Sequence, residues 1–131
     1  MYKVTKFFDF EAAHHLENYK GKCSNIHGHS YRVAVTFAGN QLDEVGMLID
    51  FHRIKILATK YIMDKYDHTD LNQSMSMVRV WGKNPTAENM AEAFFTTFND
   101  AIAGIENRER GVKVDSVVVW ESKDSYATFS K

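Results

Sequence analysis

The stretch His27-Gly28-His29-Ser30-Tyr31-Arg32-Val33-Ala34-Val35-Thr36-Phe37 predicts a β-strand and decides the fold of the chain. Side chains of a strand alternate between two faces, so residues two apart project the same way. One face is an apolar row that begins with two histidines: His27, His29, Tyr31, Val33, Val35 and Phe37. The other face carries Gly28, Ser30, Arg32 and Thr36. We therefore expect His27 and His29 to point together.

The segment from Tyr2 to Leu16 alternates in the same way and predicts a partner strand. Its even positions are mostly apolar and reach His14, whereas its odd positions are mainly polar and include His15. Alternation therefore selects His14 for the apolar row and leaves His15 where a solvated imidazole is the ordinary expectation. Three neutral imidazoles that converge from two strands suit Zn²⁺, and three protein ligands leave one coordination position open for catalysis.

Two alternatives to an open metal site remain at this point. A histidine on an apolar row is often a core residue with a hydrogen-bond partner. The only cysteine, Cys23, precedes His27 with three residues between them. It is either a reactive thiol, a small buried apolar residue, or a fourth ligand that would complete a closed structural zinc site.

Length and composition limit the class of protein. The chain has 131 residues and is 44% hydrophobic, which fits one domain over residues 1–131. A single cysteine excludes an intrachain disulfide framework and fits a reducing compartment. The chain starts directly with a strand pattern, so we expect a cytoplasmic protein. Sixteen basic and seventeen acidic residues form no long block of one sign, which favours a small-molecule partner over nucleic acid or membrane.

The remaining pattern predicts an α+β fold, with two helices between the first two strands and the last two. Asp50 can cap a helix whose apolar stripe ends near Tyr66, and Thr86 can cap a second helix that runs to Gly104. Residues 112–122 and 125–130 predict strands, residues 46–49 a short extended piece, and residues 73–83 an irregular surface segment.

Two polar features interrupt their local pattern. Asp67-His68 follows the first helix directly and is either a polar loop or a histidine base with the carboxylate that orients it. Glu121 is the last residue on a strand face that otherwise carries valines. Its carboxylate is either exposed at a strand end or paired with a cation or with a fork of N–H donors, such as the edge of an aminopyrimidinone.

Six blocks in this order resemble the 6-pyruvoyltetrahydropterin synthase and 6-carboxytetrahydropterin synthase superfamily, and they span nearly the whole chain. The blocks are Phe10-Glu11-Ala12-Ala13-His14, Cys23 with His27-Gly28-His29, Ile49-Asp50-Phe51, Asp67-His68 with Leu71-Asn72, Asn84-Pro85-Thr86-Ala87-Glu88-Asn89, and Trp120-Glu121-Ser122. The resemblance implies a T-fold, a four-stranded antiparallel sheet with two helices on one face. Its strands assemble into an oligomeric barrel, usually a homohexamer made from two trimers with sites at subunit junctions.

The resemblance also implies a role for each candidate residue. His14, His27 and His29 would bind zinc, and Cys23 would be the catalytic base. Asp67 and His68 would complete a proton relay. Glu121 would hold the amino and ring N–H groups of a pterin substrate and support the same relay, while Thr86 and Glu88 would line the pterin pocket.

The spacing within the cysteine block favours one branch of the superfamily. The three-residue gap before His27 is similar to bacterial and archaeal carboxy-type enzymes, whereas animal pyruvoyl-type enzymes usually have a longer gap. An aldolase branch commonly has glutamate where this chain has Cys23. The implied reaction converts 7,8-dihydroneopterin triphosphate to 6-carboxy-5,6,7,8-tetrahydropterin, acetaldehyde and triphosphate, on the route to queuosine. The pyruvoyl reaction and a non-catalytic zinc protein that binds pterins or purines are the alternatives.

The triphosphate has no assigned binding residues yet, and two positions depart from the family. The triphosphate needs cations, and Lys20 and Lys22 are the basic residues close to the candidate site in sequence. His15 stands where relatives often have arginine, and Tyr66 replaces a common leucine before Asp67.

Overall fold

A five-stranded sheet organises the computed structural model, which describes residues 1–103 and 110–131. The strand order is β3-β1-β2-β4-β5. The antiparallel strands are β1 (Tyr2–His14), β2 (His27–Gly39), β4 (Lys113–Ser122) and β5 (Ser125–Ser130), and β3 (Thr69–Asp70) pairs parallel to β1. The α+β prediction is confirmed. All four predicted strands are present, and β3 adds a fifth that is too short to show alternation in the sequence.

The pairing of β1 with β2 carries the histidines to one end of the sheet. The register runs without a break from Tyr2 opposite Gly39 to His14 opposite His27. Ala12 lies opposite His29, so the residues on either side of the ladder share one face. The even positions Phe8, Phe10, Ala12 and His14 are buried, as the alternation predicts.

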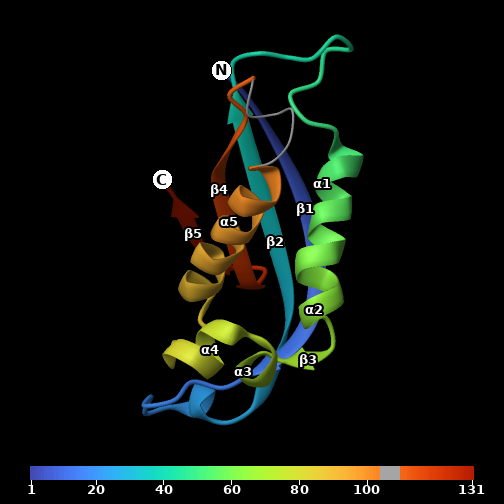
Figure 1. Ribbon diagram of the computed structural model, residues 1–131. Coiled ribbons are helices and arrows are strands. Elements are labelled where there is room, and N and C mark those ends of the chain that lie inside the picture. Colours follow the sequence, from blue (N-terminus) through green and yellow to red (C-terminus); the bar gives the residue numbers. More distant parts are fainter. Residues whose placement is uncertain (104–109) are drawn as a thin grey trace.

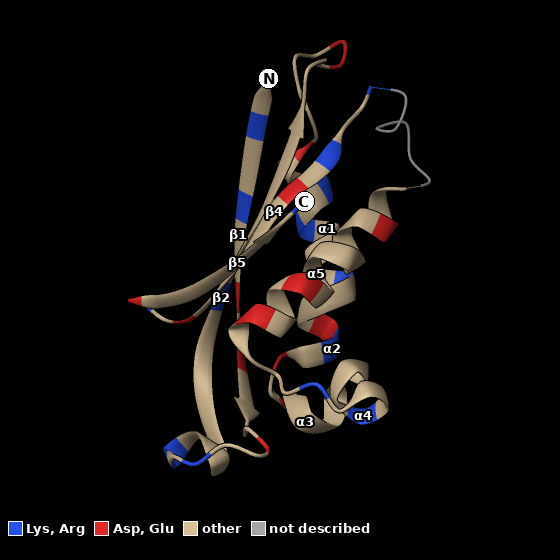
Figure 2. Ribbon diagram, turned by 90° about the vertical axis from the view of Figure 1, so that its left-hand side faces the viewer, with Lys and Arg blue, Asp and Glu red and all other residues tan. Residues whose placement is uncertain are grey.

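Two helical stretches cover one face of the sheet (Figures 1 and 2). The first comprises α1 (Phe51–Ala58), the π-helical η2 (Thr59–Met63) and α2 (Asp64–Tyr66). It begins after Asp50 and ends at Tyr66, as predicted. The Asp50 carboxylate caps its start by accepting the His52 N–H at 2.8 Å. The second is α5 (Ala87–Ile102), whose cap Thr86 accepts the Asn89 N–H at 3.2 Å. The predicted end at Gly104 lies outside the described residues.

The core lies between this sheet face and the helices. Phe10 stacks on Tyr31 at 5.1 Å between ring centroids and meets Phe94 of α5 edge-on at 6.2 Å. Full burial of an aromatic or large aliphatic side chain stabilises the fold by about 1.5–3 kcal/mol. The opposite face of the sheet is open in this chain, with Phe7 50% and Tyr126 63% exposed. The helices therefore cover the sheet on one face only.

Two local predictions are wrong. Residues 73–83 are not irregular, because α3 (Leu71–Ser74) and α4 (Ser76–Trp81) occupy most of them and bury Met75 and Met77. Helices of four and six residues are too short to give a periodic signal. Residues 46–49 are not the expected extended piece, since Gly46 adopts a left-handed φ of 86° and the chain bends again at residues 48 and 49. In the described part of the chain, no helix is long and apolar enough to span a membrane.

Candidate metal centre and its surroundings

Three imidazoles meet where β1 and β2 end. One nitrogen from each of His14, His27 and His29 lies within 4.8 Å of the others. The ring centroids are 4.6 Å apart for His14 and His27, 5.0 Å for His14 and His29, and 4.9 Å for His27 and His29. The three residues selected by alternation are therefore brought together, and this group can hold a metal ion.

Backbone carbonyls set the orientation of two of the rings. His14 Nδ1 lies 2.8 Å from the Pro85 carbonyl oxygen, and His27 Nδ1 lies 2.7 Å from the Asn25 carbonyl oxygen. A carbonyl only accepts, so each Nδ1 carries the proton and each Nε2 keeps its lone pair. His27 Nε2 and His29 Nε2 are buried without a hydrogen-bond partner among the described residues. Ring nitrogens left free in this way are what metal coordination requires.

Burial favours the neutral, metal-binding form of two of the imidazoles. His14 is 1% exposed, and this burial lowers its pKa below the ordinary 6.5, although the bond to Pro85 and the charge of Glu121 oppose the effect. Burial likewise lowers the pKa of His29. Neutral imidazole is the form that binds metal. Among the residues that the structure describes, no fourth His, Cys, Asp or Glu joins these three nitrogen donors, and such a set fits Zn²⁺ at a site with one open position.

Glu121 at the end of β4 faces the same group. Its Oε1 lies 4.0 Å from His14 Nε2, and its side chain is 31% exposed. Between the two sequence alternatives, the structure thus places this carboxylate beside the imidazoles and within reach of solvent. Next to it, Tyr31 is fully buried, its hydroxyl has no hydrogen-bond partner among the described residues, and burial together with Glu121 raises its pKa.

Asp67 and His68 form a pair that is anchored to β1. Asp67 Oδ1 accepts the Glu11 N–H at 2.9 Å and lies 3.0 Å from His68 Nδ1. The Glu11 N–H foremost, and then His68, lower the pKa of the Asp67 carboxyl. His68 N–H donates to the Glu11 carbonyl at 2.6 Å, with the backbone of His68 in the left-handed region at φ 59°. Such a backbone angle is uncommon outside glycine and is retained here by bonds on both sides of Glu11.

Two pockets adjoin the imidazole group. His29 and His68 both line a pocket of about 460 Å³ between the ends of β1 and β2 and the start of β3. His29 and Glu121 both line a second pocket of about 760 Å³, together with Trp120 and Arg32. Gly28, His29 and Ser30 border both. His29 therefore lines one pocket together with the candidate relay residue His68 and the other together with the candidate anchor Glu121.

The other candidate residues are not members of the imidazole group. Cys23 is half-buried on the short 3-10 helix η1 (Lys22–Ser24) and is not part of the imidazole group, which argues against the closed structural site. The Thr86 hydroxyl caps α5, and Glu88 is exposed in the first turn of that helix. His15 is less solvated than predicted, with a side chain 25% exposed and Nε2 3.8 Å from Glu17 Oε1.

The protein family described as 6-pyruvoyl tetrahydropterin synthase matches residues 3–131. The chain belongs to the 6-pyruvoyl tetrahydropterin synthase family. It is 38% identical over 104 residues to the 6-carboxy-5,6,7,8-tetrahydropterin synthase of Rickettsia typhi, covering 70% of this chain and 75% of that one. It is 28% identical over 141 residues to the enzyme of the same name from Haemophilus influenzae, with both chains covered in full.

Solved structures of the 6-pyruvoyl tetrahydropterin synthase family share the fold of this chain. The 6-pyruvoyl tetrahydropterin synthase of Caenorhabditis elegans superimposes with a TM-score of 0.81 at 23% identity, covering 99% of this chain and 95% of that one. The enzyme of Plasmodium vivax gives a TM-score of 0.72 at 18% identity and covers 100% and 99%. The T-fold prediction is therefore confirmed for the single chain.

Sequence reasoning missed the groups that orient this family member's histidines. The Pro85 and Asn25 carbonyls belong to the main chain, so their residue types carry no signal for the role. The Asn84-Pro85-Thr86 block did give a partial signal, since it predicts the start of α5. The structure adds that this helix start also supports the ring of His14.

Proposed function

We propose that this chain is a zinc-dependent 6-carboxy-5,6,7,8-tetrahydropterin synthase. It converts 7,8-dihydroneopterin triphosphate and water to 6-carboxytetrahydropterin, acetaldehyde and triphosphate, as a step of queuosine biosynthesis. The observation that carries the proposal is the group of three converging imidazoles beside a carboxylate, in which the Nε2 atoms of His27 and His29 are buried without a hydrogen-bond partner among the described residues. The names of the relatives from Rickettsia typhi and Haemophilus influenzae, together with the three-residue gap between Cys23 and His27, favour the carboxy reaction.

His14, His27 and His29 would hold the metal. Bound zinc supplies a Lewis acid that polarises a hydroxyl-bearing carbon centre. The chain's own contribution is orientation, because the carbonyls of Pro85 and Asn25 hold two of the rings with Nε2 turned toward the shared centre. Neighbouring groups that orient a metal ligand typically change metal affinity by 10–100-fold when they are lost.

Glu121 would anchor the substrate. A carboxylate accepts two parallel N–H bonds, and the amino group and ring N–H of a pterin present such a pair. Its partial exposure leaves the carboxylate reachable from the pocket that it shares with His29. This arrangement supports a pterin bound with its side chain toward the imidazoles. Thr86 and Glu88 at the start of α5 would border the same substrate.

Cys23, Asp67 and His68 would move the protons. Cys23 takes a proton from the substrate side chain, and His68 carries protons to and from the same region. Asp67, held as a carboxylate by the Glu11 N–H, stabilises the charged form of His68 and fixes its ring from the Nδ1 side. The pocket lined by both His29 and His68 supports a proton path between the relay and the metal centre.

The proposal also covers the triphosphate of the substrate and the assembly of the subunits. Lys20 and Lys22 are exposed next to Cys23 and would bind the triphosphate. In Figure 2 the loop and short helix at the lower end of the sheet carry basic positions in blue, which in this segment are lysines. The uncovered sheet face and the outer strand β5 support assembly into a homohexamer of two trimers, with sites at subunit junctions. A monomer in light scattering would contradict the assembly.

Product analysis tests the proposed function directly. The zinc-loaded protein is incubated with 7,8-dihydroneopterin triphosphate, and the products are identified by mass spectrometry. The carboxy reaction predicts 6-carboxytetrahydropterin and acetaldehyde. Formation of 6-pyruvoyltetrahydropterin would assign the pyruvoyl reaction instead. Unchanged substrate, with binding retained, would support the non-catalytic alternative.

A further inference from the structure

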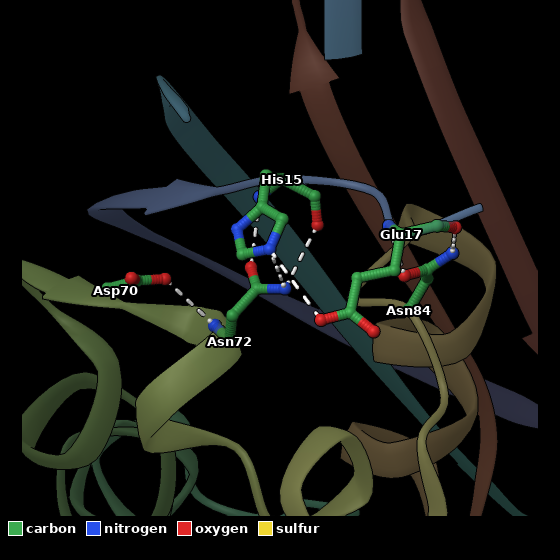
Figure 3. A network of polar contacts seen from close by, with 5 residues as sticks. All are labelled: His15, Glu17, Asp70, Asn72 and Asn84. Atoms are coloured by element: carbon green, nitrogen blue, oxygen red, sulfur yellow. Dashed lines mark hydrogen bonds and ion pairs between the residues drawn. The ribbon is translucent and has the colours of Figure 1, made fainter. Parts of the chain in front are cut away.

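Between the end of β1 and η1 the chain makes an exposed excursion from Glu17 to Lys22, and its start is held by side-chain amides (Figure 3). Asn72 Oδ1 accepts the His15 N–H at 2.9 Å, and Asn72 Nδ2 donates to the His15 carbonyl at 3.0 Å. Both main-chain groups of His15 are therefore bonded to one side chain.

A second asparagine does the same two residues later. Asn84 Oδ1 accepts the Glu17 N–H at 2.9 Å, and Asn84 Nδ2 donates to the Glu17 carbonyl at 2.9 Å. Exchange of both an N–H and a C=O bond with one residue is the pattern of a paired β-strand. Since β3 ends its pairing with β1 at Ala13 and Asp70, the two amides continue the bonding of this edge beyond the last strand residue.

The two asparagines are themselves fixed to the helices that border the candidate site. Asn72 is 5% exposed on α3, and its own N–H donates to Asp70 Oδ1 at 3.0 Å. The Asn84 carbonyl accepts the Asn89 Nδ2 of α5 at 2.8 Å. The residue after Asn84 is Pro85, whose carbonyl holds the ring of His14. The amides thus link the excursion to the segment that follows His68 and to Pro85, which supports the ring of His14.

The bonding continues from the excursion to Cys23. Leu16 lies between the two residues bound by the amides, and its N–H donates to the Cys23 carbonyl at 2.8 Å. With His15 and Glu17 fixed on either side, the position of Leu16 follows, and with it the position of the Cys23 main chain. Six residues separate Leu16 from Cys23, and the Leu16–Cys23 bond ties the far end of this span back to the residues that the amides hold.

We propose that Asn72 and Asn84 form a clamp, a pair of positioning residues that sets the place of the Cys23 thiol relative to the imidazole group and to the Asp67–His68 pair. The inference rests on the proposed role of Cys23 as the base. The two amides act through the main chain of residues 15–17 and touch no reacting atom. A one-ångström displacement of a reactive group already costs large factors in rate, so a loosened excursion lowers turnover while the fold and the metal stay in place.

The test compares Asn72→Ala and Asn84→Ala with Asn99→Ala, which replaces an exposed asparagine on α5. Circular dichroism and metal analysis first establish that each variant is folded and carries zinc. For each clamp variant we expect kcat to fall at least about tenfold with KM within about twofold, because the loss lies in the reacting geometry and not in uniform binding. Asn99→Ala should keep the parent kcat.

A second readout needs no substrate. Cys23 is the only cysteine, so the rate of its alkylation by iodoacetamide, followed by mass spectrometry, reports the thiol directly. We expect alkylation to accelerate at least about fivefold in both clamp variants, because the residues that bury the thiol become mobile. This readout holds even if the product is not the carboxypterin, which separates failure of the clamp from failure of the proposed function.

Two outcomes overturn the proposal: kcat within about twofold of the parent in folded, zinc-loaded variants, or an unchanged alkylation rate. If Asn72→Ala does not fold, Asn72→Asp takes its place. It keeps the shape and the acceptor for the His15 N–H, but it loses the donor to the His15 carbonyl, so the same fall in kcat and rise in alkylation are expected. The half-exposed Asn84 supplies an independent variant in every case.

Discussion

A His14→Ala variant, with His15→Ala as its matched control, tests the metal centre most simply. The two histidines are neighbours in β1 and in the turn that follows it, but they belong to opposite faces. His14 is 1% exposed and has both ring neighbours of the imidazole group within 5.0 Å, whereas His15 contacts Asn72 and Glu17. Each variant therefore removes one imidazole, from within the metal centre in His14→Ala and from outside it in His15→Ala.

The size of the effect follows from the ligand count. Structural zinc sites with four ligands bind with about 10–16 kcal/mol, or roughly 3 kcal/mol per ligand, so loss of one of the three imidazoles should weaken zinc at least about 100-fold. The metal-free His14→Ala variant should also lose about 1–3 kcal/mol of unfolding free energy, because the Pro85 carbonyl is left unpaired. Because His15 donates and accepts through its main chain, His15→Ala keeps those bonds.

Chelator competition and thermal unfolding with and without zinc measure both effects. For the parent chain and for His15→Ala, zinc at about 1,000 times its Kd should stabilise the fold by about 4 kcal/mol. For His14→Ala the same zinc concentration should stabilise the fold by no more than about 1.4 kcal/mol, because it is then at most about ten times the weakened Kd. Equal zinc affinity for His14→Ala and the parent, or an equal loss for both variants, would refute the assignment of ligands by strand alternation.

Three further predictions concern single side chains. Cys23→Ala should abolish turnover of dihydroneopterin triphosphate while metal analysis still finds zinc; loss of zinc would instead make Cys23 a ligand. The Asp67 carboxylate has its pKa lowered, so it stabilises the fold above its ordinary 3.8 and loses this contribution as pH falls through the lowered value. In urea unfolding, the deficit of Asp67→Asn relative to the parent should therefore shrink toward acid, and a pH-independent deficit would reject this. Tyr31→Phe removes a buried hydroxyl that has no partner among the described residues and should raise the unfolding free energy by about 1 kcal/mol, whereas a clear decrease would mean that the hydroxyl is bonded.

Local alternation was enough to predict β1, β2 and the histidine group. The choice of His14 over His15 depends only on which side of β1 each residue faces, and burial of Phe8 and Phe10 on the same face bears it out. The caps Asp50 and Thr86 were predictable for the same reason, because the bonded N–H lies two or three residues away.

Contacts between distant segments left no such signal. The amide bonds of Asn72 and Asn84 join residues 57 and 67 positions apart, and their geometry exists only after β1, α3 and α5 have packed. Strand β3 has two residues, so its pairing with Ala12 and Ala13 depends on the chain around it and not on its own pattern. Glu121 stood between two sequence alternatives until β2 and β4 were paired.

A crystal structure of the zinc-loaded protein, with anomalous scattering recorded at the zinc absorption edge, tests the central claim most directly. We predict one peak per chain, about 2.0–2.1 Å from Nε2 of His14, His27 and His29, with a non-protein ligand in the remaining position. A peak bonded to the Cys23 sulfur, or a zinc-loaded crystal with no peak between these three rings, would contradict the account.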